Sequence, residues 1–159
     1  MTCPTDRRPT VELSKLRPRK DPLIGRLLDQ KYELVERLGH GGFASVYRGR
    51  HVETDGSVAI KLLRTDMLNN ESEIRRFYIE AQNTHRLHHH NTVRVSDFGA
   101  TEDGALYLVM EYLSGESLAE TLAREVRVAP ARVCRMTEQM LKSLGEAHGY
   151  GIVHRDMKP

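Results

Sequence analysis

The chain has 159 residues, 39% of which are apolar, a length and composition typical of one ordinary globular domain with a hydrophobic core. Its formal net charge of +2 gives no electrostatic reason to expect nucleic acid or an anionic membrane surface as a partner. Only Cys3 and Cys134 are present, which excludes a disulfide framework and a cysteine-based zinc site and favours a reducing, cytoplasmic compartment.

Residues 1–23 are expected to form a flexible, basic and proline-rich tail. The first 22 residues hold four of the six prolines and six lysines or arginines, with little apolar periodicity. A solvated linker is favoured over a docking motif, because charge runs usually face solvent. The start lacks the apolar core of a signal peptide and no run is long enough to span a membrane, so any anchor is expected in a later segment of a longer parent.

A sheet is predicted from residue 24 to about residue 113. In "KYELVERLG", Tyr32 and Leu34 alternate with Glu33 and Val35, the period of two that is typical of a strand. "FASVYRGRHV" and "GSVAIKLLR" are two further strand-like runs, separated by the turn signal "ETDG". "TVRVSDFGATEDGALYLVMEYL" predicts two more strands joined by a hairpin, which makes five antiparallel strands.

One helix is expected between the third and fourth strands, and two more after Gly115. In "NNESEIRRFYIEAQNTHRLH" apolar positions recur every three or four residues, and Asn69, Asn70 or Ser72 is available as the cap. "SLAETLARE" predicts a short helix. The last helix carries one apolar stripe, made of Val133, Met136, Met140, Leu144 and Ala147. This stripe indicates helix packing and not a cofactor site, and the whole pattern predicts an α+β fold in two parts, residues 24–113 and 114–159.

The stretch "LGHGGFASVY" carries glycines suited to phosphate binding. Gly39, Gly41 and Gly42 lie between two predicted strands, where backbone N–H groups can approach phosphate oxygens without interference from Cβ atoms. A simple hairpin turn is the alternative explanation for these glycines.

Lys61 in "VAIK" lies on a strand with apolar neighbours, so its ammonium group needs either solvent or an anionic partner. Glu80 follows 19 residues later (80 − 61) in the predicted helix, and a pair of this kind would direct the lysine toward phosphates. An ordinary helical pair between Glu80 and Arg76 is the alternative on spacing alone.

The stretch "IVHRDMKP" places Asp156 and Lys158 two residues apart. A carboxylate held in a tight turn can act as a general base, and a neighbouring cation can receive a phosphate. His154 is expected to support the loop through hydrogen bonds and not to act as the base. Taken alone, the stretch also fits a surface loop.

In this order the stretches resemble the amino-terminal portion of a eukaryotic-type protein kinase of the kind found in bacteria, from about Ile24 to Pro159. The glycine loop, the strand lysine Lys61, the helix-C glutamate Glu80, the hinge "LYLVMEYLSGESL" and the catalytic-loop start "HRDMKP" carry the resemblance. It implies a kinase N-lobe, with a five-stranded antiparallel sheet and helix C, followed by the first helices of an incomplete helical C-lobe.

The resemblance also implies ATP and Mg²⁺ as cofactors and protein Ser/Thr hydroxyls as acceptors, since a lysine after "HRDM" resembles the serine/threonine kinases. Asp156 is implied to position and deprotonate the acceptor hydroxyl, with Lys158, Lys61 and Glu80 completing the catalytic set. Met110 is implied to be the gatekeeper, beside the purine. The residues implied to contact the nucleotide are Leu38, Gly39, His40, Gly41, Gly42, Phe43, Ala44, Ser45, Val46, Ala59, Lys61, Met110, Glu111, Leu113 and Ser117.

Two departures from the family pattern matter. Ala44 stands where the third loop glycine is most common, a change that active members tolerate. The sequence also stops at Pro159, before the family's metal-binding asparagine and "DFG", so this chain alone is expected not to be a competent kinase. The alternative is a truncated or pseudokinase-like module that binds nucleotide or a partner without catalysis, although the presence of Lys61, Glu80 and Asp156 argues against a degenerate parent.

Two other groups suggest metal binding at first sight. Asp97 belongs to a "DFG" tripeptide, but it precedes the hinge and leads into a hairpin, so it is not expected to be a magnesium ligand. His88, His89 and His90 are consecutive and would splay apart, with no carboxylate or cysteine at ligand spacing. No metal ligand is therefore assigned in the chain.

Overall fold

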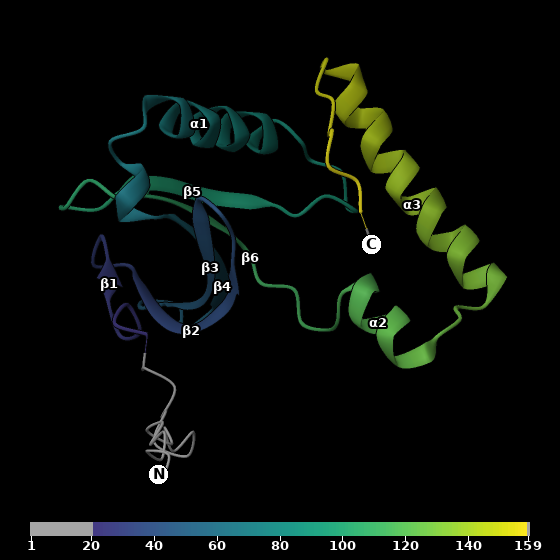
Figure 1. The fold of residues 1–159 in the computed structure, drawn as a ribbon, viewed down its shortest axis with the longest axis horizontal. Helices are drawn as coiled ribbons and strands as arrows, with labels where there is room; N and C mark the ends of the chain where they lie inside the picture. The colour runs from purple at the N-terminus through teal and green to yellow at the C-terminus, as the bar shows by residue number, and fades with distance from the viewer. Residues whose placement is uncertain (1–20, 159) are drawn as a thin grey trace, which may run out of the picture.

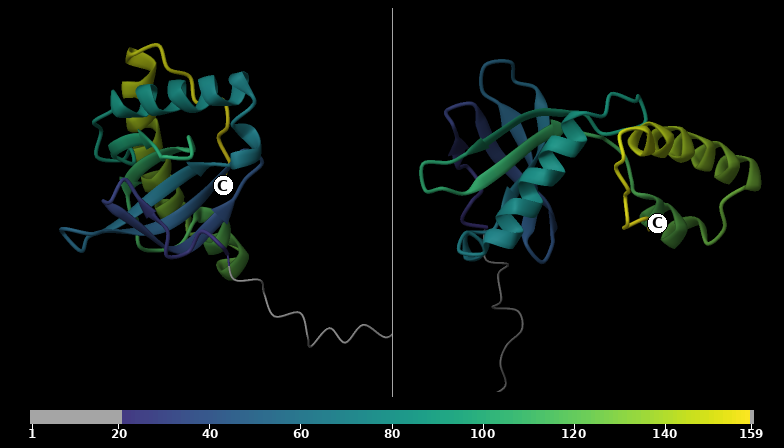
Figure 2. Two further views of the ribbon diagram at one scale, coloured as in Figure 1. Left: turned by 90° about the vertical axis from the view of Figure 1, so that its left-hand side faces the viewer. Right: turned by 90° about the horizontal axis from the view of Figure 1, so that it is seen from above.

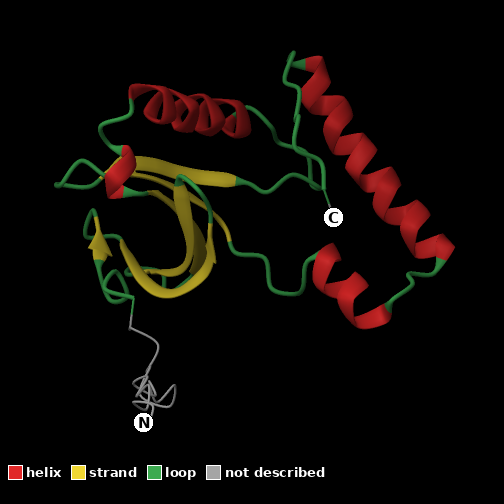
Figure 3. Cartoon of the chain, viewed as in Figure 1, coloured by secondary structure: helices red, strands yellow, loops and turns green. Residues whose placement is uncertain are grey.

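The computed structural model describes residues 21–158, so the expected tail lies almost wholly outside the described residues. The chain forms a curled antiparallel sheet with helix α1 on one face, followed by helices α2 and α3 (Figures 1 and 3). The strands are β1 (Leu27–Leu28), β2 (Tyr32–His40), β3 (Ala44–His51), β4 (Ser57–Leu63), β5 (Val95–Ala100) and β6 (Leu106–Glu111). They pair in the order β1-β2-β3-β4-β6-β5, every pair antiparallel. The predicted α+β fold is confirmed, except for the number of strands.

β1 makes a sixth strand where the periodicity predicts five. It has only two residues, too few to show an alternating pattern, and it pairs with the start of β2. Asp29 and Gln30 in the turn between them both have positive φ, 47° and 56°. The Oδ2 atom of Asp29 accepts a hydrogen bond of 2.6 Å from the hydroxyl of Tyr107, which holds this turn against the sheet.

The ordered unit begins no later than Asp21, before the expected boundary at residue 24. The Asp21 carboxylate accepts hydrogen bonds from the Leu23 amide at 3.0 Å and from the Tyr47 hydroxyl at 3.1 Å. Leu23 and Ile24 pack against the core of the sheet. These residues are therefore part of the fold.

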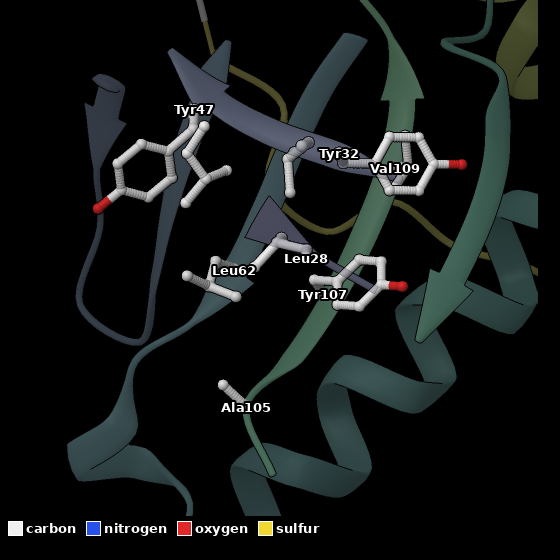
Figure 4. Close-up of a cluster of buried hydrophobic side chains, with 9 residues drawn as sticks. Leu28, Tyr32, Tyr47, Leu62, Ala105, Tyr107 and Val109 are labelled. Carbon is white, nitrogen blue, oxygen red and sulfur yellow. The ribbon is translucent and has the colours of Figure 1, made fainter. Parts of the chain in front are cut away.

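Side chains alternate between the two faces of the sheet, and each face has its own apolar cluster. On the inner face of the curl the buried residues are Leu28, Tyr32, Leu34, Tyr47, Ile60, Leu62, Ala105, Tyr107 and Val109 (Figure 4). On the opposite face, here called the helix face, Ala44, Leu63, Val95, Leu106 and Leu108 pack with Phe77 and Ala81 of α1. Lys61 lies between Ile60 and Leu62 on β4, so alternation places it on the helix face.

α1 (Glu71–His85) follows one turn of 3₁₀ helix (Thr65–Met67). The side chain of Asn70 accepts the Ser72 amide at 3.2 Å and so caps the helix at one of the expected positions. Phe77 and Ala81 are its buried residues, one turn apart. This apolar face fixes the rotation of α1 above the sheet.

α2 (Leu118–Glu125) and α3 (Pro130–Gly149) lie beside the sheet and not on it (Figure 2). On the apolar stripe of α3, Val133 and Met140 are 43% and 37% exposed, and Ala147 is buried. Met136 and Leu144 are partly buried, so within residues 21–158 the stripe is covered only in part. In the same range, no helix is both long and apolar enough to cross a membrane.

The "DFG" tripeptide of β5 is used in the packing of the sheet. Asp97 accepts a hydrogen bond of 2.9 Å from the Tyr32 hydroxyl. The ring of Phe98 lies 4.9 Å from that of Tyr78, centroid to centroid. A Cβ atom on Gly99 would lie 2.5 Å from the hydroxyl oxygen of Tyr107, whose side chain is buried, so only glycine fits here.

Gly99→Ala is therefore expected to destabilise the fold by about 1–3 kcal/mol, because the buried ring of Tyr107 cannot move aside without strain. Denaturant unfolding followed by circular dichroism measures the change. Gly145→Ala is the control, since a Cβ atom there meets nothing within 4 Å and alanine favours a helix. Equal stability of Gly99→Ala and the wild type would contradict the close approach.

Tyr32 gives an expected dependence of stability on pH. Burial, together with the hydrogen bond to Asp97, raises the pKa of Tyr32 to about 12, whereas an unfolded tyrosine ionises near pH 10. The folded state therefore keeps the proton longer, so this contribution to stability is complete below pH 10 and is lost as the pH rises toward 12. The free energy of unfolding should fall more steeply between pH 9.5 and 11, about the span in which free tyrosine ionises, in the wild type than in Tyr32→Phe. Tyr150→Phe, at an exposed tyrosine, should follow the wild type.

Candidate active site

Lys61 and Glu80 form an ion pair across the helix face. The Lys61 Nζ atom lies 2.5 Å and 2.6 Å from the two carboxylate oxygens of Glu80, and 5.9 Å from the ring centroid of Phe77. The predicted pairing is confirmed. The alternative partner of Glu80, Arg76, instead binds Glu73 at 2.8 Å, one turn earlier on α1.

Stability alone does not explain this pair. The side chains of Lys61 and Glu80 are 24% and 48% exposed, and pairs open to solvent contribute at most about 1 kcal/mol. The ammonium group keeps an open side and is held in one orientation by both carboxylate oxygens. It is thus placed to contact a second anion.

The hairpin between β2 and β3 carries the predicted glycines at its end. The amide of Gly41 donates to the carbonyl of Ala44 at 2.9 Å and closes the turn. Gly39, Gly41 and Gly42 all lie outside the left-handed region, and a Cβ atom on Gly39 or Gly42 would meet nothing within 4 Å. Neither conformation nor packing requires glycine at these two positions. The open space beside the backbone suits the close approach of a phosphate.

Val46, Ala59 and Met110 form a half-buried apolar patch beside Lys61. Val46 is the cross-strand partner of Lys61, and Ala59 is that of Met110, so all four share the helix face. The three apolar side chains are partly exposed. A flat apolar ring could pack on this patch with its phosphates toward the ammonium group.

The segment after β6 offers backbone groups to such a ring. The amide of Glu111 is already bonded to the carbonyl of Arg94 at 3.0 Å, which leaves its carbonyl as the candidate ligand contact. Leu113 is 63% exposed, and within residues 21–158 its amide has no backbone acceptor. Ser117 caps α2, and its hydroxyl is bonded to Glu120 in a capping box, so a ligand there would compete with the cap.

Two predicted nucleotide contacts point their side chains away from the helix face. Ser45 is buried on the inner face of the curl, with its Oγ atom 3.0 Å from His40 Nδ1. His40 Nε2 in turn lies 3.3 Å from a guanidinium nitrogen of Arg64, which is also bonded to Asp66. Only the backbone of Ser45 and His40 can therefore face a ligand. No sequence motif pointed to Arg64, because it depends on a contact across the hairpin.

Leu38 and Phe43, at the end of the same hairpin, are 46% and 53% exposed. Apolar side chains this open at a loop end are available to cover a bound ligand. Ala44 is buried against α1, so its small side chain is required by packing.

The turn that contains Asp156 follows α3. The amide of Asp156 donates to His154 Nδ1 at 3.3 Å, so His154 supports the turn as predicted. Arg155 between them has a positive φ of 60°, an unusual conformation for a residue other than glycine. The Asp156 carboxylate is exposed and lies 3.1 Å from the ammonium group of Lys158.

The candidate catalytic residues thus form two ion pairs in different parts of the chain. Lys61 and Glu80 belong to the sheet with α1, and Asp156 and Lys158 to the segment that turns back from α3 toward α2 (Figures 1 and 2). Among the described residues, no group of three His, Cys, Asp or Glu side chains is arranged to hold a metal ion.

Comparison with known proteins agrees with this geometry. The model of the protein kinase domain family matches residues 32–159. The chain is 41% identical to serine/threonine-protein kinase pkn3 of Myxococcus xanthus over 89% of its own length and 26% of that protein. It is 39% identical to PrkC of Bacillus subtilis, over 86% and 21%. It therefore spans about a quarter of the length of these relatives.

The crystal structure of the Mycobacterium tuberculosis PknI kinase domain superimposes with a TM-score of 0.70 at 28% identity, over 86% of this chain and 55% of that one. The shared region includes the curled sheet, α1 and the following helices. The match of a family model to most of the chain, at the residues that build the two ion pairs, leads to one conclusion. The chain belongs to the protein kinase family and is similar to the bacterial serine/threonine kinases.

Proposed function

We propose that this chain provides the ATP-binding part of a serine/threonine protein kinase, which transfers the γ-phosphoryl group of ATP to protein hydroxyls. The ion pair of Lys61 with Glu80, below an open glycine hairpin, is the observation that carries the proposal. The names of the related kinases support the choice of Ser/Thr acceptors.

Lys61 would bind the phosphates of ATP and Glu80 would orient it. Phosphoryl transfer depends mainly on positioning and on neutralising charge, so a fixed ammonium group serves both needs. The ammonium group of Lys61 has three N–H donors. Two of them bond to the carboxylate oxygens of Glu80, which leaves one for a phosphate oxygen. The backbone of Gly39 and Gly42 would approach the same phosphates from above.

The purine would lie on Val46 and Ala59, with Met110 beside it. The carbonyl of Glu111 and the free amide of Leu113 would then bond to its edge, one as acceptor and one as donor. This arrangement buries the flat ring and directs the phosphates toward Lys61. The proposal rests on the strand pairing that places Val46, Ala59 and Met110 on the same face as Lys61.

Asp156 would position the acceptor hydroxyl and take its proton. Its carboxylate is exposed, as a group that meets a protein substrate must be, and its backbone is fixed by His154. Lys158, now paired with Asp156, would contact the transferred phosphate. Mg²⁺, which supplies charge neutralisation in this family, has no ligand set that we assign among the described residues.

A binding module without catalysis is the second candidate. This candidate differs from the catalytic proposal in one requirement, because a module that only binds has no need of a carboxylate in the turn after α3. Both ion pairs are formed here, which favours the catalytic proposal.

Lys61→Met is expected to weaken ATP binding by about ten- to a hundredfold, since it removes a charge-assisted hydrogen bond worth about 1.5–3 kcal/mol. Glu80→Gln should weaken binding less, because it leaves the ammonium group in place but unfixed. Titration calorimetry with the whole chain measures both. Lys142→Met and Glu138→Gln are matched controls at an exposed Lys–Glu pair of α3, and should leave affinity unchanged. Equal loss in the control pair would contradict a site at Lys61.

Asp156→Asn is expected to leave ATP affinity within about twofold of the wild type, because the group acts on the acceptor and not on the nucleotide. Any phosphoryl transfer to a Ser/Thr peptide that the chain supports should fall at least a hundredfold, the usual contribution of a general base. Transfer of ³³P from ATP, measured beside the binding titration, separates the two effects. Undiminished transfer in the variant would rule out this role.

A further inference from the structure

The segment that follows α1 is attached to one stripe of α3. Ser143 and Glu146 are spaced by three residues and lie on one face of that helix, and Tyr150, its C-cap, follows four residues later. Each of them contacts a residue between Arg86 and Thr92. This stripe differs from the apolar one, and no motif in the sequence points to it.

Glu146 makes the central contact. Its carboxylate oxygens each lie 3.2 Å from the backbone amide of His88, and Oε2 also lies 3.0 Å from the amide of His89. A carboxylate that accepts two backbone N–H groups fixes the position of the backbone itself, whatever the side chains at those positions.

Two weaker contacts flank Glu146 on the same stripe. The hydroxyl oxygens of Thr92 and Ser143 are 2.6 Å apart. The guanidinium carbon of Arg86 lies 5.0 Å from the ring centroid of Tyr150, within the range of a cation–π contact. The attachment therefore has three points along α3.

The attached segment begins where α1 ends. Arg86 is the C-cap of α1, and Glu80 lies five residues before the last helical residue, or about 7.5 Å along the helix axis. A rigid helix transmits a displacement of its end over that distance. The position of Glu80 relative to Lys61 thus depends on where α3 holds the segment.

We infer that Glu146 is a positioning residue for the phosphoryl transfer proposed above, on which this inference rests. By holding the amides of His88 and His89, it fixes the end of α1 to α3 and keeps Glu80 beside Lys61. Its role would be exerted entirely through Glu80, with no contact to the nucleotide.

Amide hydrogen exchange of the whole chain tests the attachment without any nucleotide. Glu146→Ala should raise the exchange rates of the His88 and His89 amides at least tenfold, and those of the last two turns of α1 as well. Glu146→Gln keeps an acceptor oxygen of the same reach and should retain most of the protection. Glu138→Ala, an exposed glutamate of the same helix, is the matched control. Unchanged exchange in α1 would overturn the inference.

ATP affinity tests the coupling to Glu80. Glu146→Ala should weaken binding severalfold in the wild-type background, and Glu146→Gln should restore it. In the Glu80→Gln background, Glu146→Ala should have no further effect, because there is no longer a carboxylate to position. Equal weakening in both backgrounds would show a general structural role and overturn the inference.

The exchange experiment and the ATP titration together distinguish a failure of the proposed function from a failure of the inference about Glu146. If the wild-type chain binds no ATP, the proposed function fails, and the exchange rates of α1 alone then decide for or against positioning by Glu146. If Glu146→Ala does not fold, Glu146→Asp replaces it, since the shorter side chain withdraws the carboxylate from the amides. Exchange in Glu146→Asp should resemble that expected for the alanine variant, and wild-type rates would overturn the inference.

Discussion

The antiparallel register of β3, β4 and β6 determines where every candidate group on the sheet lies. Because side chains alternate, Lys61 shares a face with Val46 and Ala59 only while Ile60 and Leu62 face the apolar cluster inside the curl. A shift of one residue would bury the ammonium group in that cluster and expose two leucine-sized side chains. The apolar face opposite the candidate site therefore keeps that site in place.

Much of this arrangement could be predicted from the sequence, because it depends on local periodicity. The long strands, the cap at Asn70 and the pairing of Lys61 with Glu80 follow from spacing and residue type. β1 could not be predicted, since two residues show no period. The contact of Glu146 with the amides of His88 and His89 could not be predicted either, because backbone donors leave no trace in the sequence.

The "DFG" tripeptide of β5 shows how far a motif depends on its context. A tripeptide whose aspartate is a magnesium ligand at a later position in protein kinases serves here as a hydrogen-bond acceptor, an aromatic contact and a space for a tyrosine ring. Asp97 binds the hydroxyl of Tyr32, and Gly99 makes room for Tyr107. The three residue types alone do not distinguish this structural use from a metal site. The position of the tripeptide in the chain, after the first helix and before the hinge, predicts the structural use.

The placement of Glu80 draws on both parts of the molecule. Phe77 and Ala81 fix the rotation of α1 on the sheet through apolar packing, which tolerates sliding along the helix axis. Hydrogen bonds of defined geometry, such as those that Glu146 accepts from the amides of His88 and His89, resist that sliding at the end of the helix. An ion pair as exposed as that of Lys61 with Glu80 contributes too little stability to hold α1 in place by itself. Its two short contacts therefore require that the surrounding packing hold α1 in place, and the inference about Glu146 implies that a change at α3 would reach Lys61 without touching it.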